Sequence, residues 1–316
     1  MTNAVLRQTT PEPERVSVQR VRYHGWSDSI IISNGRVEAV VVPSIGRVMQ
    51  FRFVGEEGVF WENEELMGKS PEPESKEWGN FGGDKAWPAP QADWPRITKR
   101  AWPPPVAFDS LPVVASVNDA SIELLSPVDP AYGIRTRRRI HLDPQKAVMK
   151  ITTTFEKVAG NPQRVSVWVV TQVRDPLGVY VPVPQTSIYP AGYNKQSPEL
   201  PQGLRVKDGL LSVVRDRQAS HKIGSDAGTL IWVGAIHVLR IDSPRIDKAE
   251  YPDGGSSVEV YTNKDPQAYV ELEMLGPLRH VRIGDRIEQT ITYTLLRRTE
   301  KDPAVEATKA FLQNRN

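Results

Sequence analysis

Short apolar runs with a two-residue period are the feature that most constrains how this chain can fold. In residues 47–53, Met49, Phe51 and Phe53 fall on one face of an extended chain and alternate with polar side chains. Pairs such as Asp-Pro, Asn-Pro and Asp-Gly separate these runs, and a helical period is almost absent. This pattern predicts an antiparallel all-β sandwich or barrel. The further runs cover residues 120–125, 134–142, 147–156, 164–173, 229–239, 257–262, 267–274 and 286–297.

A β-hairpin is predicted near the N-terminus. The apolar run 29–33 is followed by Asn34-Gly35 and then by the apolar run 37–42. Asn-Gly readily supplies the two positive-φ residues of a type I′ turn. We therefore expect a hairpin closed by a two-residue turn.

The one convincing helix lies at the C-terminus. Asp302 can cap it, and Pro303 suits its first position. Its predicted apolar stripe consists of Ala304, Val305, Ala307, Phe311 and Leu312. Since no composition shift marks a linker, we predict a loose tail at 1–16, a single β domain at 17–300 and the C-terminal helix at 301–316.

Composition excludes several classes of function. The 40 Lys and Arg residues nearly balance the 38 Asp and Glu residues, so neither nucleic acid nor an anionic membrane is expected as a partner. The absence of Cys rules out disulfides, thiolate catalysis and Cys-ligated metals. The five His residues show no paired spacing that suggests a metal site, so no metal or cofactor is predicted.

The N-terminal residues lack an apolar stretch of signal-peptide length, and no segment approaches the length of a membrane span. A cytoplasmic location is the default expectation, and a periplasmic one applies if an export signal has been removed. The sequence does not specify the oligomeric state.

Residues 61–112 break the β pattern. They hold five of the eight Trp residues and a dense set of prolines. Because Pro cannot donate to a sheet ladder, we predict that this segment is no central strand. A long loop with so much aromatic surface either packs as a plug or lines a binding cleft.

The first candidate site lies in this segment, at residues 80–91. The Gly82-Gly83 pair lets the backbone approach a ligand closely. Polar groups beside flat aromatic faces are typical of a carbohydrate site, whereas the alternative is that the indoles fill the core and that two of the charges form a local ion pair. The candidate residues are Asn80, Asp84, Lys85, Trp87, Gln91 and Trp94.

The second candidate site is the strand at 269–274. A period of two places Tyr269, Glu271 and Glu273 on one face. Two carboxylates about 7 Å apart along a strand can do acid–base work, one with its pKa raised by the other. The alternative is an ordinary solvent-facing side of a strand.

Two other patterns favour structural roles. Arg135, Arg137, Arg139 and His141 share one face of a predicted strand and could bind an acidic or phosphorylated sugar, but such a stripe is more often a solvated face balanced by cross-strand acids. His237 lies in an apolar strand and is interpreted as a core histidine with its hydrogen bonds satisfied.

Three segments together resemble the galactose mutarotase-like superfamily, which contains the aldose epimerases, and in particular a bacterial branch of unknown function. Residues 33–49 (SNGRVEAVVVPSIGRVM) resemble the opening hairpin of that group. Residues 82–88 (GGDKAWP) are similar to the Gly-Gly…Trp-Pro loop of its hexose-phosphate epimerase branch. Leu272-Glu273 and the strand at 287–296 look like its C-terminal ending.

The resemblance implies a β-supersandwich with one short C-terminal helix and with a sugar or oligosaccharide on its open face. In the epimerases a Glu removes the proton of the anomeric hydroxyl and a His protonates the ring oxygen. The match carries the role of base over to Glu273, with Glu271 as its reserve. The strand nearest to that of the family's central His holds Trp168 and Gln172, which we add to the substrate-binding candidates, but it contains no His.

Three functions remain open. The first is an aldose-1-epimerase-like isomerase with Glu273 as base and Asp84 or Lys85 as its partner. The second is a sugar-binding protein without catalysis, which the missing His favours. The third is a polysaccharide-cleaving enzyme that uses Asp84 and Glu273 as a carboxylate pair.

Overall fold

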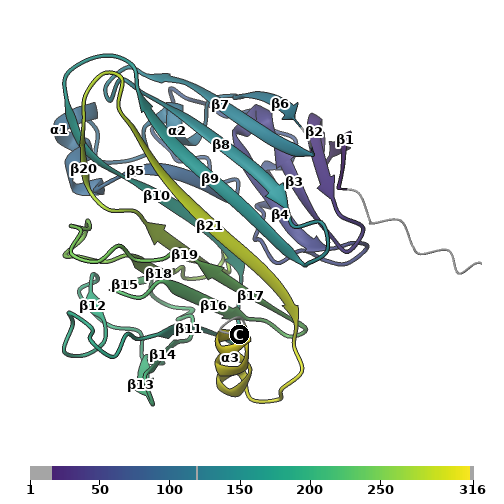
Figure 1. The fold of residues 1–316 in the computed structure, drawn as a ribbon, viewed down its shortest axis with the longest axis vertical. Coiled ribbons are helices and arrows are strands. Elements are labelled where there is room, and N and C mark those ends of the chain that lie inside the picture. Colours follow the sequence, from purple (N-terminus) through teal and green to yellow (C-terminus); the bar gives the residue numbers. More distant parts are fainter. Residues whose placement is uncertain (1–15, 119, 314–316) are drawn as a thin grey trace, which may run out of the picture.

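Two antiparallel β-sheets make up most of the molecule. The computed structural model describes residues 16–118 and 120–313, so the tail expected at residues 1–16 lies outside the described residues except for Val16. Within this range the sheets have 11 and 10 strands, and all their neighbouring strands pair antiparallel. The predicted all-β sandwich is therefore confirmed (Figure 1).

The 11-stranded sheet carries the candidate site. From one edge to the other its strands are β1 (Ser17–Tyr23), β2 (Trp26–Ser33), β3 (Val37–Val42), β4 (Arg47–Phe53), β5 (Asp84–Ala89), β10 (Gln163–Arg174), β19 (Tyr269–Leu275), β18 (Val258–Thr262), β15 (His221–Ser225) and β12 (Asn194–Lys195), with β20 (Arg279–Val281) paired to β10.

The 10-stranded sheet lies against it. Its order is β13 (Arg205–Lys207), β14 (Leu210–Val213), β11 (Gly178–Pro182), β16 (Thr229–Val233), β17 (His237–Asp242), β21 (Arg286–Arg297), β9 (Val148–Lys157), β8 (Ile134–Leu142), β7 (Ser121–Asp129) and β6 (Val114–Asn118). The described helices are α1 (Trp94–Thr98), α2 (Val106–Asp109) and α3 (Pro303–Leu312), with short 3-10 turns η1 (Pro43–Ile45), η2 (Glu64–Leu66) and η3 (Gln91–Asp93).

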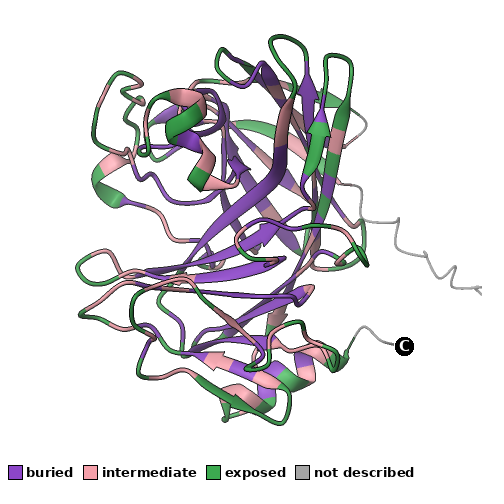
Figure 2. Ribbon diagram, turned by 90° about the vertical axis from the view of Figure 1, so that its left-hand side faces the viewer, coloured by how far each residue is buried: buried purple, intermediate pink, exposed green. Residues whose placement is uncertain are grey.

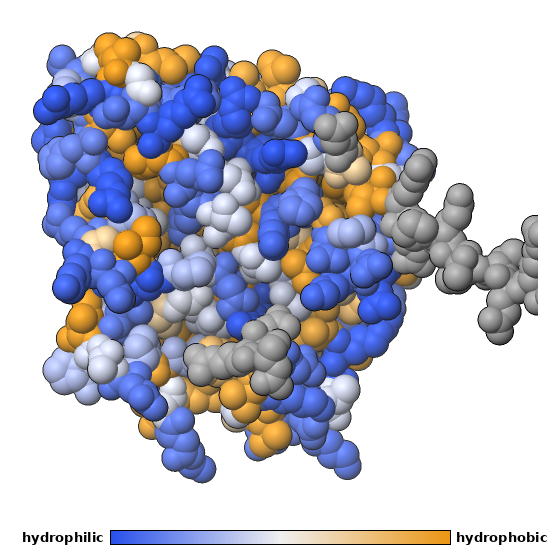
Figure 3. Space-filling view, in the orientation of Figure 1, coloured by the Kyte–Doolittle hydropathy of each residue, from blue (hydrophilic) through white to orange (hydrophobic). Residues whose placement is uncertain are grey.

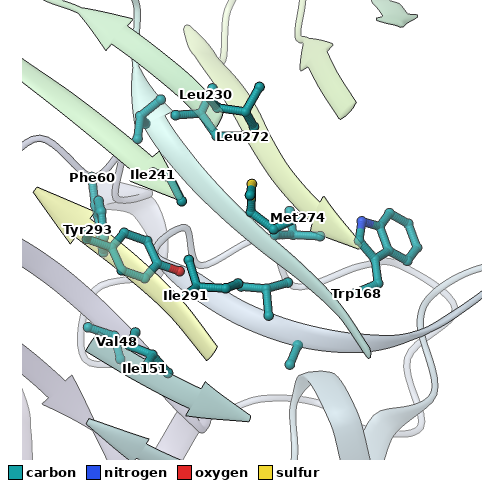
Figure 4. Packing of buried hydrophobic residues seen from close by; sticks show 14 of the residues in the cluster. Val48, Phe60, Ile151, Trp168, Leu230, Ile241, Leu272, Met274, Ile291 and Tyr293 are labelled. Atoms are coloured by element: carbon teal, nitrogen blue, oxygen red, sulfur yellow. The ribbon is translucent and has the colours of Figure 1, made fainter. Parts of the chain in front are cut away.

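The main hydrophobic core fills the space between the sheets. Figure 4 shows Leu272 and Met274 of β19 packed with Ile291 and Tyr293 of β21. Because side chains alternate along a strand, the odd-numbered residues of β19 point to the other face of the 11-stranded sheet. We call this second face the loop-covered face. Figure 2 shows the central strands as buried and the loops around them as half-buried or exposed.

The N-terminal hairpin forms, but its predicted two-residue turn is wrong. Ser33 pairs with Glu38, and Gly35 has positive φ whereas Asn34 does not. Instead, the Asn34 side-chain oxygen accepts hydrogen bonds from the backbone N–H groups of Arg36 and Val37. Its amide nitrogen donates to the loop between β8 and β9, so the residue fastens this turn to the other sheet.

The expectation that residues 61–112 hold no central strand is wrong. β5 lies between β4 and β10 in the middle of the sheet, and it contains Pro88. Its ladder to β10 is continuous, whereas its pairing to β4 is limited to Val48 opposite Asp84. The proline therefore lies where the strand has a neighbour on one side only, which is the position that Pro tolerates.

A bulge changes the predicted alternation in β4. Val40 pairs with Gln50, but Val41 pairs with Val48, so Met49 is an extra residue in the ladder. Met49 packs in a small cluster with Val40, separate from the main core that contains Phe51. Met49 and Phe51 therefore lie in different clusters, which differs from the sequence-based expectation.

The C-terminal helix is confirmed. The Asp302 side chain caps it by accepting a hydrogen bond from the Ala304 N–H, and Pro303 occupies the first turn. Ala307 is buried as expected, but Val305 and Leu312 are exposed, so the buried stripe is narrower than predicted.

The solvent side of the 10-stranded sheet is mainly polar, as the space-filling view of this face shows (Figure 3). Arg135 and Arg137 point to this side, and both contact the carboxylate of Glu156 on the neighbouring strand, at 2.8 and 3.2 Å. This supports the interpretation of the arginine stripe as a face balanced by cross-strand acids. His237 is buried and bonded to Glu56 at 2.8 Å, as expected of a satisfied histidine. None of the described helices is long and apolar enough to span a membrane.

Candidate functional site

Three neighbouring strands align a lysine and a glutamate on the loop-covered face. Val170 of β10 lies directly opposite Lys85 on β5 and directly opposite Glu273 on β19. Since adjacent strands are about 4.8 Å apart, the Cα atoms of Lys85 and Glu273 are roughly 10 Å apart. We call Lys85, Val170 and Glu273 the row. Only the small side chain of Val170 lies between its two ends.

Lys85 is a buried cation without a polar partner. Its side chain is 1% exposed, and among the described residues its Nζ has no hydrogen-bond partner. Nζ lies 5.3 Å from the ring centre of Trp78 and 5.1 Å from that of Trp87. Burial, and then the positive charge of Arg47, lower the pKa of Lys85 to about 7.

Glu273 is buried, and one of its two carboxylate oxygens accepts hydrogen bonds. Its Oε2 accepts hydrogen bonds from the Trp168 indole at 2.6 Å and from the Lys222 ammonium at 2.9 Å. No described residue provides a hydrogen-bond partner for its Oε1. Burial raises the pKa of Glu273 well above its usual value, although Lys222 acts in the opposite direction.

Glu271 lies one position along the same face. The Gln172 amide donates a hydrogen bond to it at 2.9 Å, and burial raises the pKa of Glu271. Tyr269 follows on this face, where its hydroxyl contacts Asn80 and Gln172, and burial raises the pKa of Tyr269. The structure therefore brings together Asn80, Gln172, Tyr269 and both predicted glutamates.

Lys222 of β15 forms ion pairs with two carboxylates on the same face. Its Nζ lies 2.6 Å from Glu259 and 2.9 Å from Glu273. Burial alone would lower the pKa of Lys222, but the two carboxylates outweigh burial and raise it. With 20% of its side chain exposed, Lys222 connects the buried row to solvent.

Arg47 of β4 lies at the Lys85 end of the row. Its Nη atoms donate to the Gly82 carbonyl at 2.8 Å and to Asp109 at 2.9 Å. Asp109 also accepts hydrogen bonds from the indoles of Trp78 and Trp87. The arginine thus anchors the loop and α2 over the face that holds Lys85.

The predicted role of Asp84 as a catalytic partner is wrong. Asp84 points into the inter-sheet core, where it forms an ion pair with Arg138 and accepts hydrogen bonds from Thr171 and Tyr293, each at 2.6 Å. Asp84 precedes Lys85 in β5, and successive residues of a strand face opposite sides of the sheet. Asp84 and Glu273 therefore cannot act as a carboxylate pair.

The predicted stacking role of Trp87 and Trp94 is also wrong. These indoles are 2% and 0% exposed, and their N–H groups are bonded to Asp109 and to the Pro88 carbonyl. Trp168 is equally buried, with its N–H on Glu273. The loop indoles act as a plug, which the sequence left open as an alternative. Gln91 lies beyond β5 in η3, half-buried.

Half-buried aromatic rings do occur elsewhere on this face. Trp61 lies against Tyr269 with ring centres 4.7 Å apart, and Tyr261 lies 6.4 Å from Tyr269. Tyr261 is directly opposite Glu271 on β18. These rings offer the apolar surface beside the carboxylates that the sequence had placed at Trp87 and Trp94.

A cavity of about 890 Å³ lies beside the loops after β11, β17 and β19, and its lining includes Arg245, Tyr251 and Asp253. Neither Lys85 nor Glu273 lines this cavity. Burial and the charge of Glu259 raise the pKa of Asp253 to about 6. No cluster of three or more His, Asp or Glu side chains in residues 16–118 and 120–313 is placed to hold a metal ion.

Four charged members of the site were not predicted from the sequence. Arg47 and Glu259 each lie within a recognised apolar run, and a charge at such a position is the signal that could have identified them. Lys222 and Asp109 carried no such signal, because neither lies in a run of regular alternation. The missed residues are Arg47, Asp109, Lys222 and Glu259.

The fold is a galactose mutarotase-like β-sandwich. A galactose mutarotase-like protein from Lactobacillus casei ATCC 334 superposes with a TM-score of 0.57 at 9% identity, over 85% of this chain and 100% of that chain. A galactose mutarotase-like protein from Clostridium acetobutylicum gives a TM-score of 0.56 at 9% identity, over 90% and 99%. A TPR-domain-containing protein from Parabacteroides distasonis gives 0.58 at 12% identity over 86% of this chain, which spans 48% of that longer protein.

The family model described as "Domain of unknown function (DUF4380)" matches residues 28–296, and the chain belongs to this family. No curated protein matches the sequence.

Proposed function

We propose that this protein binds a free reducing sugar on the loop-covered face and catalyses the exchange of its anomers, with Glu273 as the base and Lys85 as the acid. The observation that carries the proposal is the row formed by Lys85, Val170 and Glu273. Both ends of this row are buried, and each has a polar atom with no hydrogen-bond partner within residues 16–118 and 120–313. The galactose mutarotase-like fold is consistent with a sugar ligand.

The pKa shifts of Lys85 and Glu273 are consistent with their proposed roles as acid and base. A general acid or base is most effective when its pKa lies near the working pH, and burial moves the pKa values of both groups in that direction. Glu273 removes the proton from the anomeric hydroxyl, and the bond between C1 and the ring oxygen breaks. Lys85 gives its proton to the ring oxygen. After rotation about the C1–C2 bond, the ring closes as both protons return.

Lys85 thereby takes the part that a histidine plays in the epimerases that the sequence resembles. Gln172 lies on the same face but has no proton to give near neutral pH, and Thr171 points into the inter-sheet core. Lys222 stabilises the negative charge of Glu273 when the sugar is absent.

Binding without catalysis is the competing function. It is favoured by the engagement of Glu273 Oε2 with Lys222 and Trp168, which restrains that carboxylate. It shares the same face and the same class of ligand, so the two functions differ only in whether anomers exchange.

Anomeric-exchange NMR on a panel of aldoses, with and without protein, tests the proposal. We expect faster exchange with wild type and a loss of about 10²–10⁴-fold in Glu273→Gln. Glu123→Gln, on the solvent side of the 10-stranded sheet, is the matched control and should retain the wild-type rate. Saturable binding without exchange would establish the binding function, and the absence of binding to every sugar would overturn both.

A further inference from the structure

Two lysines on the loop-covered face have opposite surroundings. Lys222 is held by two carboxylates at 2.6 and 2.9 Å, which keep its ammonium charged. Lys85 has no ion pair among the described residues and is packed between the indoles of Trp78 and Trp87. Only the second environment leaves an amine free to act as a nucleophile.

The charged side chains near Lys85 do not form an ion pair with it, and most of them are bound to other residues. Arg47 on β4 is its cationic neighbour, because the pairing of β4 and β5 sets the two residues side by side. Asp109 of α2 is bound to that arginine, and Asp84 of β5 is paired with Arg138 on the far side of the sheet. Glu271 of β19 is hydrogen-bonded to Gln172.

We propose that Lys85 forms an imine with the aldehyde carbon of the open-chain sugar. A lysine becomes nucleophilic when it is desolvated in an apolar pocket or placed beside another cation, and both conditions hold here. The inference rests on the proposed function, because anomeric exchange passes through the open-chain aldehyde on this same face.

The step is balanced without any redox partner. The lone pair of neutral Lys85 Nζ attacks the carbonyl carbon, and the carbonyl oxygen takes up a proton to give a carbinolamine. The carbinolamine then loses its hydroxyl group as water, which leaves a C=N bond to Lys85. Glu273 lies across Val170 from Lys85, and its Oε1 has no hydrogen-bond partner among the described residues, so this carboxyl group can transfer the proton that the leaving water needs.

Trp78 lies over the amine of Lys85. Its ring centre is 5.3 Å from Nζ, and the residue is half-buried. The burial of the amine behind this indole also protects a formed imine from hydrolysis.

Reductive trapping tests the proposal. The full-length protein is incubated with glycolaldehyde and cyanoborohydride at pH 7, and the labelled lysines are mapped by mass spectrometry. Glycolaldehyde is too short to close a sugar ring, so this test does not depend on ring opening. At pH 7 about half of the Lys85 amine is neutral, against roughly 1 in 2,500 for an ordinary lysine.

We expect Lys85 to be labelled at least about tenfold faster than Lys222 and than the exposed Lys146. Lys85→Arg should abolish that label and leave the slow labelling of the other lysines unchanged. Labelling that spreads over the exposed lysines without Lys85 would overturn the proposal.

The two proposals fail separately. Anomeric exchange without a label on Lys85 would support the proposed function and refute the proposal that Lys85 forms an imine. A label on Lys85 with no exchange of any aldose would establish the nucleophile and end the proposed function. Near-UV circular dichroism of Lys85→Arg and of a second variant, Lys85→Met, establishes that each is folded.

Discussion

Asp84 and Lys85 are neighbours in β5, yet they belong to two different kinds of buried polar cluster. Asp84 faces the inter-sheet core, where Arg138, Thr171 and Tyr293 engage both of its carboxylate oxygens. Lys85 faces the loops, where its ammonium lies over the rings of Trp78 and Trp87 and no residue that the structure describes forms a hydrogen bond with it. The first cluster is complete, whereas the second leaves polar atoms free.

The difference shows what each cluster contributes. A buried charge whose partners are all in place specifies one arrangement of the chain, and removing a partner leaves the remaining charge without compensation. A buried charge without a partner lowers the stability of the folded state, so it persists where it serves a function. This contrast indicates a structural role for Asp84, and it is the reason that we propose a chemical role for Lys85.

The largest expected effect comes from breaking the complete cluster. Asp84→Ala should lower the free energy of unfolding by about 3–5 kcal/mol, because it leaves Arg138 buried without its carboxylate. Lys85→Met should instead raise the free energy of unfolding by about 1–4 kcal/mol, because it replaces an unpaired charge among indoles by an apolar group. Urea denaturation of both variants measures the two changes, and equal losses would contradict the contrast.

An intermediate effect is expected from pH. Lys85 has a pKa of about 7 in the folded protein and about 10.4 in the unfolded chain, so between these values the unfolded chain binds more protons. The free energy of unfolding should therefore rise with pH in this window, relative to Lys85→Met, by up to about 1.4 kcal/mol per unit. Urea titrations at pH 6, 8 and 10 measure the difference, and a flat difference would show that Lys85 stays charged.

The smallest effect is expected at the surface. Arg174 and Glu57 form an ion pair at 2.7 Å with side chains that are 46% and 82% exposed. Arg174→Gln should change the free energy of unfolding by less than about 0.5 kcal/mol, since water screens such pairs. This baseline is measured under the same conditions, and a change as large as that of Asp84→Ala would mean that burial does not explain the contrast.

Much of the fold could be predicted because alternation is a local property. The runs at 134–142, 147–156 and 164–173 correspond to long, regular strands, and the Asp302 cap follows from the chemistry of a few adjacent residues. The predictions failed at Asn34 and Pro88, where a contact with the other sheet or the absence of a second neighbouring strand decided the outcome. Such information lies outside any local window.

The candidate site was predicted in part for the same reason. Period two placed Glu271 and Glu273 on one face, and their register with β10 agrees with that placement. The same alternation places Asp84 and Lys85 on opposite faces of the sheet. This could not be predicted, because the sequence did not show that these residues form a strand. The burial of Trp87 and Trp94 depends on α2 and the surrounding loop, which sequence patterns did not locate.

The indoles that plug the loop-covered face give the molecule an optical property. The rings of Trp87 and Trp168 are 5.1 Å apart, those of Trp78 and Trp87 are 5.7 Å apart, and those of Trp94 and Trp102 are 6.2 Å apart. Lys85 Nζ lies 5.3 and 5.1 Å from the ring centres of Trp78 and Trp87, so a change in its charge alters the surroundings of two of the protein's fluorescent side chains.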